Sequence, residues 1–463
     1  RNHHSPGRRR RRLARASTKE GATLSPALLL RRRRQRLERS SSSTMGKGGD
    51  LSSSLVGEAA AKDVLIDGEL YDVSGFRHPG GSIVKFLTGH GDATEAFREF
   101  HGRSVKAQKM LKALPHKPVP DGAVRSHNGR EALSRDYAAL RAELEAEGCF
   151  EPHAGEIAYR LSEIAAMHAV GVYLLAATSF WTAGVVMLGL ASGRCGWLMH
   201  EAGHYSLTGV MRVDRVLQEL IYGVGCGMSA AWWRNQHNKH HATPQKLKHD
   251  VDLDTLPLVA FHASIAAKAK GPVLKFWLRL QAALFIPVSC LLVALGWQAF
   301  LHPRHVLRTK RYREAAFIAL RYVLIFGVVL KDASLREKAL TYLLYDQVAA
   351  AYIFTNFALS HTHLPVTRPD EDLHWVEYAA NHTTNIAPNF LTNWWMAMLN
   401  FQIEHHLFPQ MPQFRHKYIS PRVKALFEKH GLVYDVRPYF SCLGQTLWNL
   451  HAVGNGLEPA KLD

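Results

Sequence analysis

Long apolar segments with few charges occupy the central and C-terminal parts of the chain. The first, 164–199, has Arg194 as its one charged residue. A helix needs about 20 residues to cross a bilayer, so these 36 residues predict a helical hairpin. Segments 315–330 and 340–359 predict a second hairpin, and 280–301 is a further apolar run that contains a proline.

Basic residues set an expected orientation for these segments. A basic loop, 304–313, follows the run 280–301, and more basic residues lie at 415–424. Positive charge favours the cytosolic side. If both basic stretches are cytosolic, 280–301 cannot cross, and we expect it to lie in the interface or to dip in and return. This leaves four spans in two hairpins, although Arg321 and Asp346 are awkward for helices that face lipid. The alternative is a soluble helical enzyme, which would need to bury five such runs in one domain.

A shorter, more polar part precedes the apolar segments. Residues 64–73 read as two strand-like runs separated by Asp67 and Gly68, a dipeptide that favours tight hairpin turns. An amphipathic stretch then leads to His101. Residues 119–158, rich in Arg, Glu and Ala, predict a linker with helical character.

Charge is concentrated at the N-terminus. The formal net charge is +18, but within residues 1–44 thirteen arginines and one lysine stand against two glutamates. We expect the mature protein to start at Met45, after this tail. The rest of the chain is only mildly basic, which argues against nucleic acid as a partner. Five scattered cysteines support neither a disulfide framework nor a thiolate zinc site. The unusual count is that of histidine, 27 residues.

Two of these histidines lie in the polar part, 23 residues apart. His78 precedes Pro79, Gly80 and Gly81, and His101 ends the amphipathic stretch. Two such side chains can clamp one planar cofactor from opposite faces, and ligation by two histidines suits electron transfer. A turn histidine and a helix-end histidine in an ordinary small domain fit the spacing equally well.

Seven more histidines form three short motifs beside the apolar segments. Residues three or four apart share a face of a helix, so each motif directs two or three imidazoles one way. Imidazole suits iron, zinc or copper, and three such motifs argue against a merely structural role. The candidate catalytic and metal-binding residues are His200, His204, His237, His240, His241, His405 and His406.

Seven histidines exceed the needs of one metal, so the pattern predicts two metals. His361, just past the last apolar run, is our candidate for an eighth ligand, and Asn356, His363 and His382 are lesser candidates. Gln402 stands where a third histidine would complete the last motif, and it could bind a metal weakly or hydrogen-bond to a metal-bound water. Two irons held in this way can activate O2 and take hydrogen from an unactivated C–H bond. The substrate should then be an aliphatic chain from the bilayer.

The polar part, through 71–73, His78 to Gly81, 92–94, Phe100 and His101, resembles cytochrome b5. The resemblance implies that His78 and His101 ligate haem b and that Gly80 and Gly81 let the backbone turn close to the ring. The whole pattern, above all the motif 402–406 with glutamine in first place, resembles the front-end fatty acyl desaturases with a fused cytochrome b5.

That resemblance implies a multi-domain fold: a small α+β haem domain, then an all-α membrane domain of about four transmembrane helices with a cytosolic helical cap. It implies two non-haem irons and places Asp250, Asp252 and Asp254, just after the second motif, in supporting or capping roles. Trp232, Trp233 and Trp375 could line the acyl tunnel or mark the membrane interface. The expected domains are a basic tail 1–44, a haem domain 62–118, a linker 119–158, a desaturase domain 159–440 and a C-terminal tail 441–463.

The expected function is insertion of a cis double bond at Δ5 of a C20 polyunsaturated acyl chain, carried by a phospholipid or coenzyme A. The alternatives are a Δ6 desaturase of C18 chains, a sphingoid-base desaturase or hydroxylase, and a membrane-anchored haem electron carrier without enzyme activity. The expected partners are the lipid bilayer, O2 and cytochrome b5 reductase as electron donor. The expected location is the endoplasmic reticulum membrane, multi-pass, with the haem domain and active site cytosolic.

Overall fold

A three-stranded antiparallel sheet opens the part of the chain that the computed structural model describes, which is residues 62–89, 91–119 and 130–457. β1 (Asp63–Ile66) and β2 (Glu69–Asp72) form the predicted hairpin, and β3 (His116–Pro118), which the pattern did not predict, pairs with β2. Asp67 and Gly68 take positive φ angles of 50° and 79°, as the tight turn requires. The other elements here are η2 (Ser82–Phe86), α2 (Thr94–His101) and α3 (Val105–Lys112). The predicted tail 1–44 lies outside the described residues.

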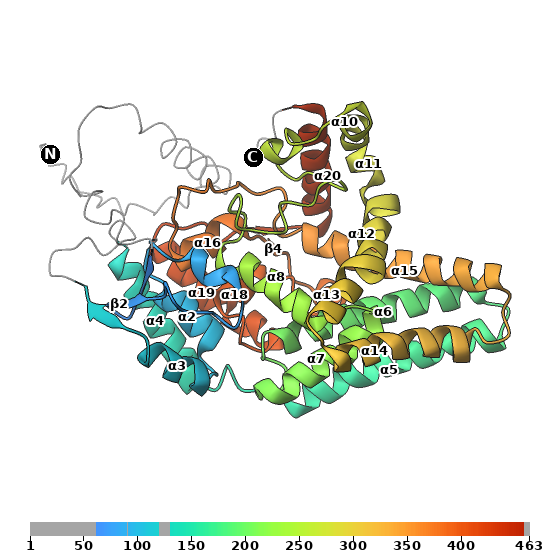
Figure 1. The fold of residues 1–463 in the computed structure, drawn as a ribbon, viewed down its shortest axis with the longest axis horizontal. Helices are drawn as coiled ribbons and strands as arrows, with labels where there is room; N and C mark the ends of the chain where they lie inside the picture. Colours follow the sequence, from blue (N-terminus) through green and yellow to red (C-terminus); the bar gives the residue numbers. More distant parts are fainter. Residues whose placement is uncertain (1–61, 90, 120–129, 458–463) are drawn as a thin grey trace, which may run out of the picture. The chain divides into compact units, whose positions relative to one another are not determined.

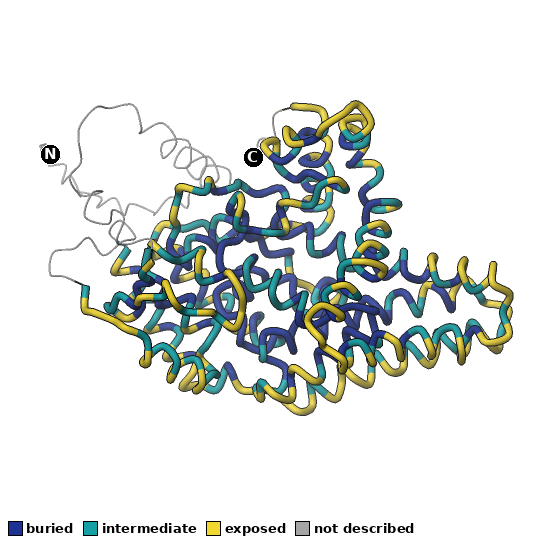
Figure 2. Tube along the Cα trace, in the orientation of Figure 1, coloured by how far each residue is buried: buried dark blue, intermediate teal, exposed yellow. Residues whose placement is uncertain are grey.

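Two helical hairpins occupy the predicted apolar segments. α5 (Ala154–Ala177) and α6 (Trp181–Gly203) form the first. The second consists of α14 (Tyr312–Tyr322), its π-helical continuation η5 (Val323–Val329) and α15 (Leu335–Ala358). The long helices lie side by side (Figure 1). Exposed residues run along their outer ends (Figure 2), and these include the large apolar side chains Tyr173 and Phe180, 62% and 65% exposed. Such an apolar surface suits contact with lipid.

Glycines on α6 let the two hairpins approach each other closely. A Cβ atom added at Gly189 would lie 2.5 Å from the Cβ of Val348, and one at Gly193 would lie 2.3 Å from Cδ1 of Tyr352. Both distances are too short for non-bonded carbon atoms. Small residues at helix contacts are a common feature of packing within membranes.

One helix of the described residues is long and apolar enough to cross a membrane by length and composition, and it is Gln281–Arg308. It contains the run 280–301, which the charge pattern predicted to lie in the interface or to dip in and return. The predicted count of four spans is therefore not confirmed and stays a prediction. The helix consists of α11 (Gln281–Leu284), η3 (Phe285–Ser289), α12 (Cys290–Gly296), η4 (Trp297–Leu301) and α13 (His302–Arg308).

Arg321 and Asp346 face each other inside the helical layer. A guanidinium nitrogen of Arg321 lies 3.7 Å from a carboxylate oxygen of Asp346, and both side chains are buried. The side-chain amide of Gln298 also donates to Asp346, at 2.9 Å. Because the two charges are paired and buried, neither is exposed to lipid, and the objection that they raised against the second hairpin is removed.

A cap of shorter helices contains the largest apolar core. α4 (Glu131–Ala146) lies within the predicted linker, but it is a packed helix of this core. Its apolar positions, Leu133, Tyr137, Leu140 and Leu144, recur at spacings of four, three and four, which places them on one face. The core also takes in α16 (Trp375–His382), α18 (Gln402–Leu407) and α19 (His416–Lys429).

A helix, α20 (Tyr439–Asn455), occupies most of the predicted C-terminal tail. It buries Leu450 and Val453 against α10 (Pro272–Arg279), α11 and their neighbours. The side-chain amide of Gln281 donates to the carbonyl of Leu450 at 2.7 Å. The remaining elements are α7 (Met211–Cys226), α8 (Ala230–Ala242), α9 (Ala263–Ala266), β4 (Asn385–Ile386), α17 (Phe390–Trp395), η6 (Gln413–Arg415) and β5 (Val436–Arg437), with β4 and β5 paired in parallel.

Candidate functional site

Three helices carry the histidine motifs to one region. Each motif lies at the C-terminal part of its helix, and residues three and four apart point the same way. The hydroxyl of Ser229 fixes the start of α8 by accepting from the backbone N–H of Trp232 at 3.2 Å. α6 supplies His200 and ends beside His204, α8 supplies His237, His240 and His241, and α18 supplies His405 and His406.

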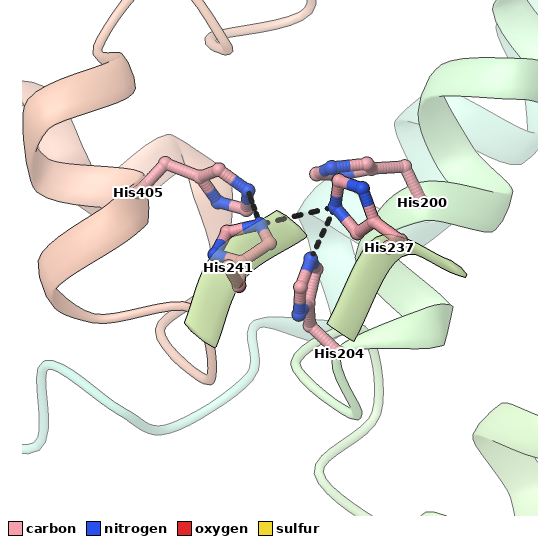
Figure 3. Close-up of side chains that lie close together, drawn as sticks. All are labelled: His200, His204, His237, His241 and His405. Carbon is pink, nitrogen blue, oxygen red and sulfur yellow. Dashed lines mark hydrogen bonds between the residues drawn. The ribbon is translucent and has the colours of Figure 1, made fainter. Parts of the chain in front are cut away.

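Five of these side chains form a first cluster: His200, His204, His237, His241 and His405. Each offers a ring nitrogen, and these atoms all lie within 4.8 Å of one another. Figure 3 shows the rings converging from three separate helices. The Nε2 atoms of His204 and His237 are 3.0 Å apart, those of His237 and His241 also 3.0 Å, and those of His241 and His405 3.1 Å.

These separations fit a shared metal ion. With metal–nitrogen bonds of about 2.1 Å, two ligands at right angles would have nitrogens roughly 3 Å apart. Hydrogen bonds alone explain the cluster poorly, because a neutral imidazole has one N–H and here several Nε2 atoms face one another. Imidazole ligands without thiolates suit iron, copper, zinc or nickel.

A second cluster lies beside the first and consists of His240, His361 and His406. The ring centres of His240 and His361 are 4.7 Å apart, and those of His361 and His406 are 4.9 Å apart. The ring of His406 stacks on that of His241 at 4.1 Å, so the two clusters adjoin. The structure thus brings the predicted eighth histidine into the site. Gln402 lines the same cavity as the second cluster.

Burial keeps most of these histidines neutral, as metal ligation requires. Burial, together with nearby histidines, lowers the pKa of His204 and of His361 to about 3. The same causes hold the pKa values of His237, His241, His405 and His406 well below the usual range. His240 differs: burial opposes its charged form, but Asp250 and Asp252 together raise its pKa to about 9.

Neighbouring polar groups orient the ligand rings. Nδ1 of His240 lies 2.9 Å from a carboxylate oxygen of Asp250, in keeping with the supporting role expected for the acidic loop. Nδ1 of His361 lies 2.8 Å from the carbonyl oxygen of His382. Nδ1 of His200 lies 3.1 Å from the side-chain amide of Gln413. The oxygens of Asp250 and His382 accept from Nδ1–H and so select the tautomer that presents Nε2 to a metal, whereas the amide N–H of Gln413 donates to Nδ1 of His200.

Two residues near the first cluster were not predicted from the sequence. One is Gln413. The other is His416, whose buried ring lies 5.9 Å from that of His405, centre to centre. They lie eight and eleven residues beyond His405, outside any short motif, so spacing alone gave no signal. Two of the lesser candidates have other contacts: Asn356 accepts from the hydroxyl of Tyr439 at 3.1 Å, and both ring nitrogens of His382 have oxygen partners.

An apolar cavity of about 690 Å³ adjoins the clusters. His200, His237 and the whole second cluster line it, together with many aliphatic and aromatic side chains. Trp232 and Trp233 line this cavity, whereas Trp375 lies in the core of the cap. An apolar cavity with a few polar groups beside the histidine clusters suits an aliphatic ligand. The lining includes Phe285, Leu292, Val293, Trp297, Ile353 and Phe357.

A second cavity, of about 770 Å³, lies beside the small sheet and contains His78 and His101 in its wall. The two ring centres are 5.9 Å apart. Two imidazoles bound to opposite sides of one iron would be separated by roughly 6 Å, given bonds of about 2 Å. Burial lowers the pKa of His101 to about 4, and also lowers that of His78. The residues present therefore fit a haem.

The two glycines after His78 have separate steric reasons. A Cβ at Gly80 would lie 2.7 Å from Cε1 of His78, so a larger residue would collide with the ring. Gly81 has a φ angle of 87°, and a Cβ there would lie 2.8 Å from Nδ2 of Asn235 on α8. Gly80 thus gives room for a ligand ring, while Gly81 allows α8 to approach.

Comparison with known proteins agrees with both sites. Residues 179–438 match the fatty acid desaturase family, and residues 61–119 match the cytochrome b5-like heme/steroid binding domain. An acyl-lipid (8-3)-desaturase from Rebecca salina is 57% identical over 86% of this chain and 92% of its own. One from a Thraustochytrium species is 51% identical over 90% of this chain and 100% of its own. A Delta(8)-fatty-acid desaturase from Arabidopsis thaliana is 29% identical over 86% of this chain and 90% of its own.

The family also identifies the two cofactors. The cytochrome b5-like domain binds haem, and the histidine clusters of the desaturase domain fit a diiron centre. The fold is accordingly a haem domain with a small sheet followed by a mostly helical desaturase domain. The chain is an oxidoreductase that belongs to the fatty acid desaturase family, within the front-end desaturases that carry a fused cytochrome b5.

Proposed function

We propose that this desaturase inserts a cis double bond at Δ5 of a C20 polyunsaturated acyl chain. The observation that carries the reaction type is the convergence of eight histidines in two adjoining clusters beside an apolar cavity. Two relatives carry the name acyl-lipid (8-3)-desaturase. A Δ6 desaturase of C18 chains and Δ8-type enzymes are alternatives that fit the same family.

The reaction needs two irons that activate O2 with electrons supplied one at a time through the haem. The protein's own part is to bind, orient and exclude water. The apolar cavity removes the acyl chain from water, which favours aliphatic substrates by the area they bury. His200, His237 and His361 border this cavity, so a carbon held against them lies next to the metal site. Asp250 keeps His240 in one orientation and thereby fixes the cluster that faces the chain.

The site residues carry separate assignments. We propose that His200, His204, His237, His241 and His405 hold one iron, and that His240, His361 and His406 hold the other. Gln402 completes the second site directly or through a water molecule. His78 and His101 hold the haem iron.

The membrane arrangement belongs to the same proposal. Four spans, α5, α6, α14 with η5, and α15, would anchor the protein in the endoplasmic reticulum membrane. The haem domain and both clusters would lie on the cytosolic side, where cytochrome b5 reductase supplies electrons. Attaching a reporter to the connection at 178–180 tests this topology: cytosolic accessibility of that connection would contradict it.

Expression in yeast fed with C18 and C20 polyunsaturated acids tests the regiochemistry. Gas chromatography and mass spectrometry locate the new double bond, and Δ5 in a C20 product is the expected result. A Δ6 product, a Δ8 product or a modified sphingoid base would each replace the proposal with the corresponding alternative. The variant His405→Ala should form no product while it keeps the haem absorption band. Undiminished function in that variant would instead support a haem carrier without enzyme activity.

A further inference from the structure

The second cavity, which has His78 and His101 in its wall and which we call the haem cavity, has walls of two kinds. One wall comes from the haem domain and is mainly apolar apart from His78, His101, Ser104 and Lys106. The other wall comes from α7, α8, the start of α14 and their connections, all of them in the desaturase domain. This second wall carries four guanidinium groups, and Glu219 is the one carboxylate among the described residues that line the cavity. The four are Arg215, Arg234, Arg311 and Arg313.

Two of the four arginines lack a direct acidic partner among the described residues. Arg313 pairs with Glu219 at 2.5 Å, and Arg311 lies 3.6 Å from a carboxylate oxygen of Glu314. Arg215, in contrast, donates to the hydroxyl of Tyr205 at 3.2 Å, and Arg234 donates to the side-chain oxygen of Gln218. Both of these partners are neutral.

Arg234 is the more costly of the two to leave without a counter-ion. Burial lowers its pKa, which means that its charged form has lost hydration. A buried cation is normally paired with an anion or bound to an anionic ligand. An anionic ligand in the cavity would therefore stabilise this wall.

Haem b carries negative charge of the kind that this wall would bind. It is a flat apolar ring system with two carboxylates on one edge, and it needs axial ligands above and below the plane. The haem domain offers the two histidines, the apolar contact and Lys106, while the desaturase domain offers the four arginines. We propose that Arg215 and Arg234 bind the two carboxylates of the haem, so that the haem is held jointly by both domains.

α8 connects the haem cavity to the histidine clusters. Nδ2 of Asn235 donates to the carbonyl of Gly80 at 2.9 Å, which fixes α8 against the loop that follows His78. His237 comes two residues later, and Trp233 stacks on its ring with centres 4.2 Å apart. Two residues of helix correspond to an axial rise of about 3 Å. Anchoring one haem carboxylate at Arg234 on α8 therefore holds the electron donor beside a helix that carries three of the proposed iron ligands.

The test uses the full chain, freed of haem and reconstituted with either haem b or its dimethyl ester. The ester keeps the ring and the iron but removes the carboxylate charges. The variants are Arg215→Gln and Arg234→Gln, and the matched control is Arg279→Gln, an exposed arginine on α10 away from the cavity. The readouts are the rate of haem transfer to excess apomyoglobin and the midpoint potential of the haem.

With haem b, each cavity variant should release haem roughly tenfold faster or more, the effect of one charge-assisted hydrogen bond. Its midpoint potential should fall, because loss of a nearby positive charge favours the oxidised haem. With the ester, the cavity variants should release haem at the same rate as the unmodified chain, while their midpoint potential still falls, because the positive charge is lost in either case. Haem release that is accelerated equally with haem b and with the ester would show a general structural defect and would overturn the proposal. Release of haem b from the cavity variants as slow as from Arg279→Gln would also overturn it. Neither readout depends on the position of the double bond.

Discussion

The replacement Asp250→Asn offers the sharpest test of how the second cluster is held. The Asp250 side chain is 0% exposed, and one of its oxygens lies 2.9 Å from Nδ1 of His240. The same oxygen accepts from the backbone N–H of Gln245 at 2.7 Å, and the other accepts from that of Asp252 at 2.9 Å. Asparagine keeps the shape but loses the charge, and its amide group cannot accept on both sides. Loss of a hydrogen bond to a charged group costs about 1.5–3 kcal/mol.

That energy corresponds to roughly a ten- to hundredfold loss, which is also the usual effect of removing the partner of a metal-bound histidine. We expect Asp250→Asn to lower iron content, measured by mass spectrometry after titration with iron, and to lower product formation by a similar factor. Asp254→Asn is the matched control, because that side chain is 60% exposed and, within the part of the chain that the structure describes, forms an ion pair with the exposed Lys268 at 3.3 Å. The haem band should be unchanged in both variants. Iron binding in Asp250→Asn equal to that in Asp254→Asn would refute the reasoning.

Three further predictions concern packing, pH and the metal. Gly193→Leu should destabilise the helical hairpins by about 1–3 kcal/mol or more, since the site has no room beside Tyr352; thermal unfolding in detergent measures this, and an unchanged midpoint would contradict it. Burial raises the pKa of Asp214 from its ordinary 3.8 to about 6, so the native state binds more protons than the unfolded state between these values. Stability should therefore fall as pH rises from about 4 to 6, and Asp214→Asn should flatten that dependence in thermal unfolding. Removal of iron by a chelator should abolish product and leave the haem band intact, whereas product at full yield without iron would argue against a diiron enzyme.

The sequence predicted the composition of the sites better than their surroundings. Residues three and four apart on a helix must share a face, so His237, His240 and His241 could be recognised together without a structure. The turn at Asp67 and Gly68 was equally local. Gln413 and His416 come near the first cluster only through the packing of α19 on α18, and no spacing rule encodes that.

The structure departs from the predicted domain bounds for the same reason. Residues 441–463 were predicted to form a C-terminal tail, whereas tertiary packing of α20 buries Leu450 and Val453. In α4 the apolar spacing was present, but its partner surface, formed by residues such as Phe408 and Phe427, lies more than 250 positions away. The charge rule predicted that 280–301 lies in the interface or dips in and returns, whereas length and composition make Gln281–Arg308 a candidate span. Local sequence cannot decide whether the charge of the flanking loops or the length and composition of the helix determines its position.

The contact between Asn235 and Gly80 bears on how such fusions can be rebuilt. Gly81 admits no side chain there, and Asn235 precedes the proposed iron ligand His237 by two residues. A chimaera that takes its electron-donating module from another protein would have to match the shape of one turn of α8, not merely the length of the connecting peptide. The surfaces of the haem domain and the desaturase domain are therefore matched to each other. Exchanging the haem domain without also changing residues 234 and 235 of the desaturase domain should uncouple haem reduction from desaturation.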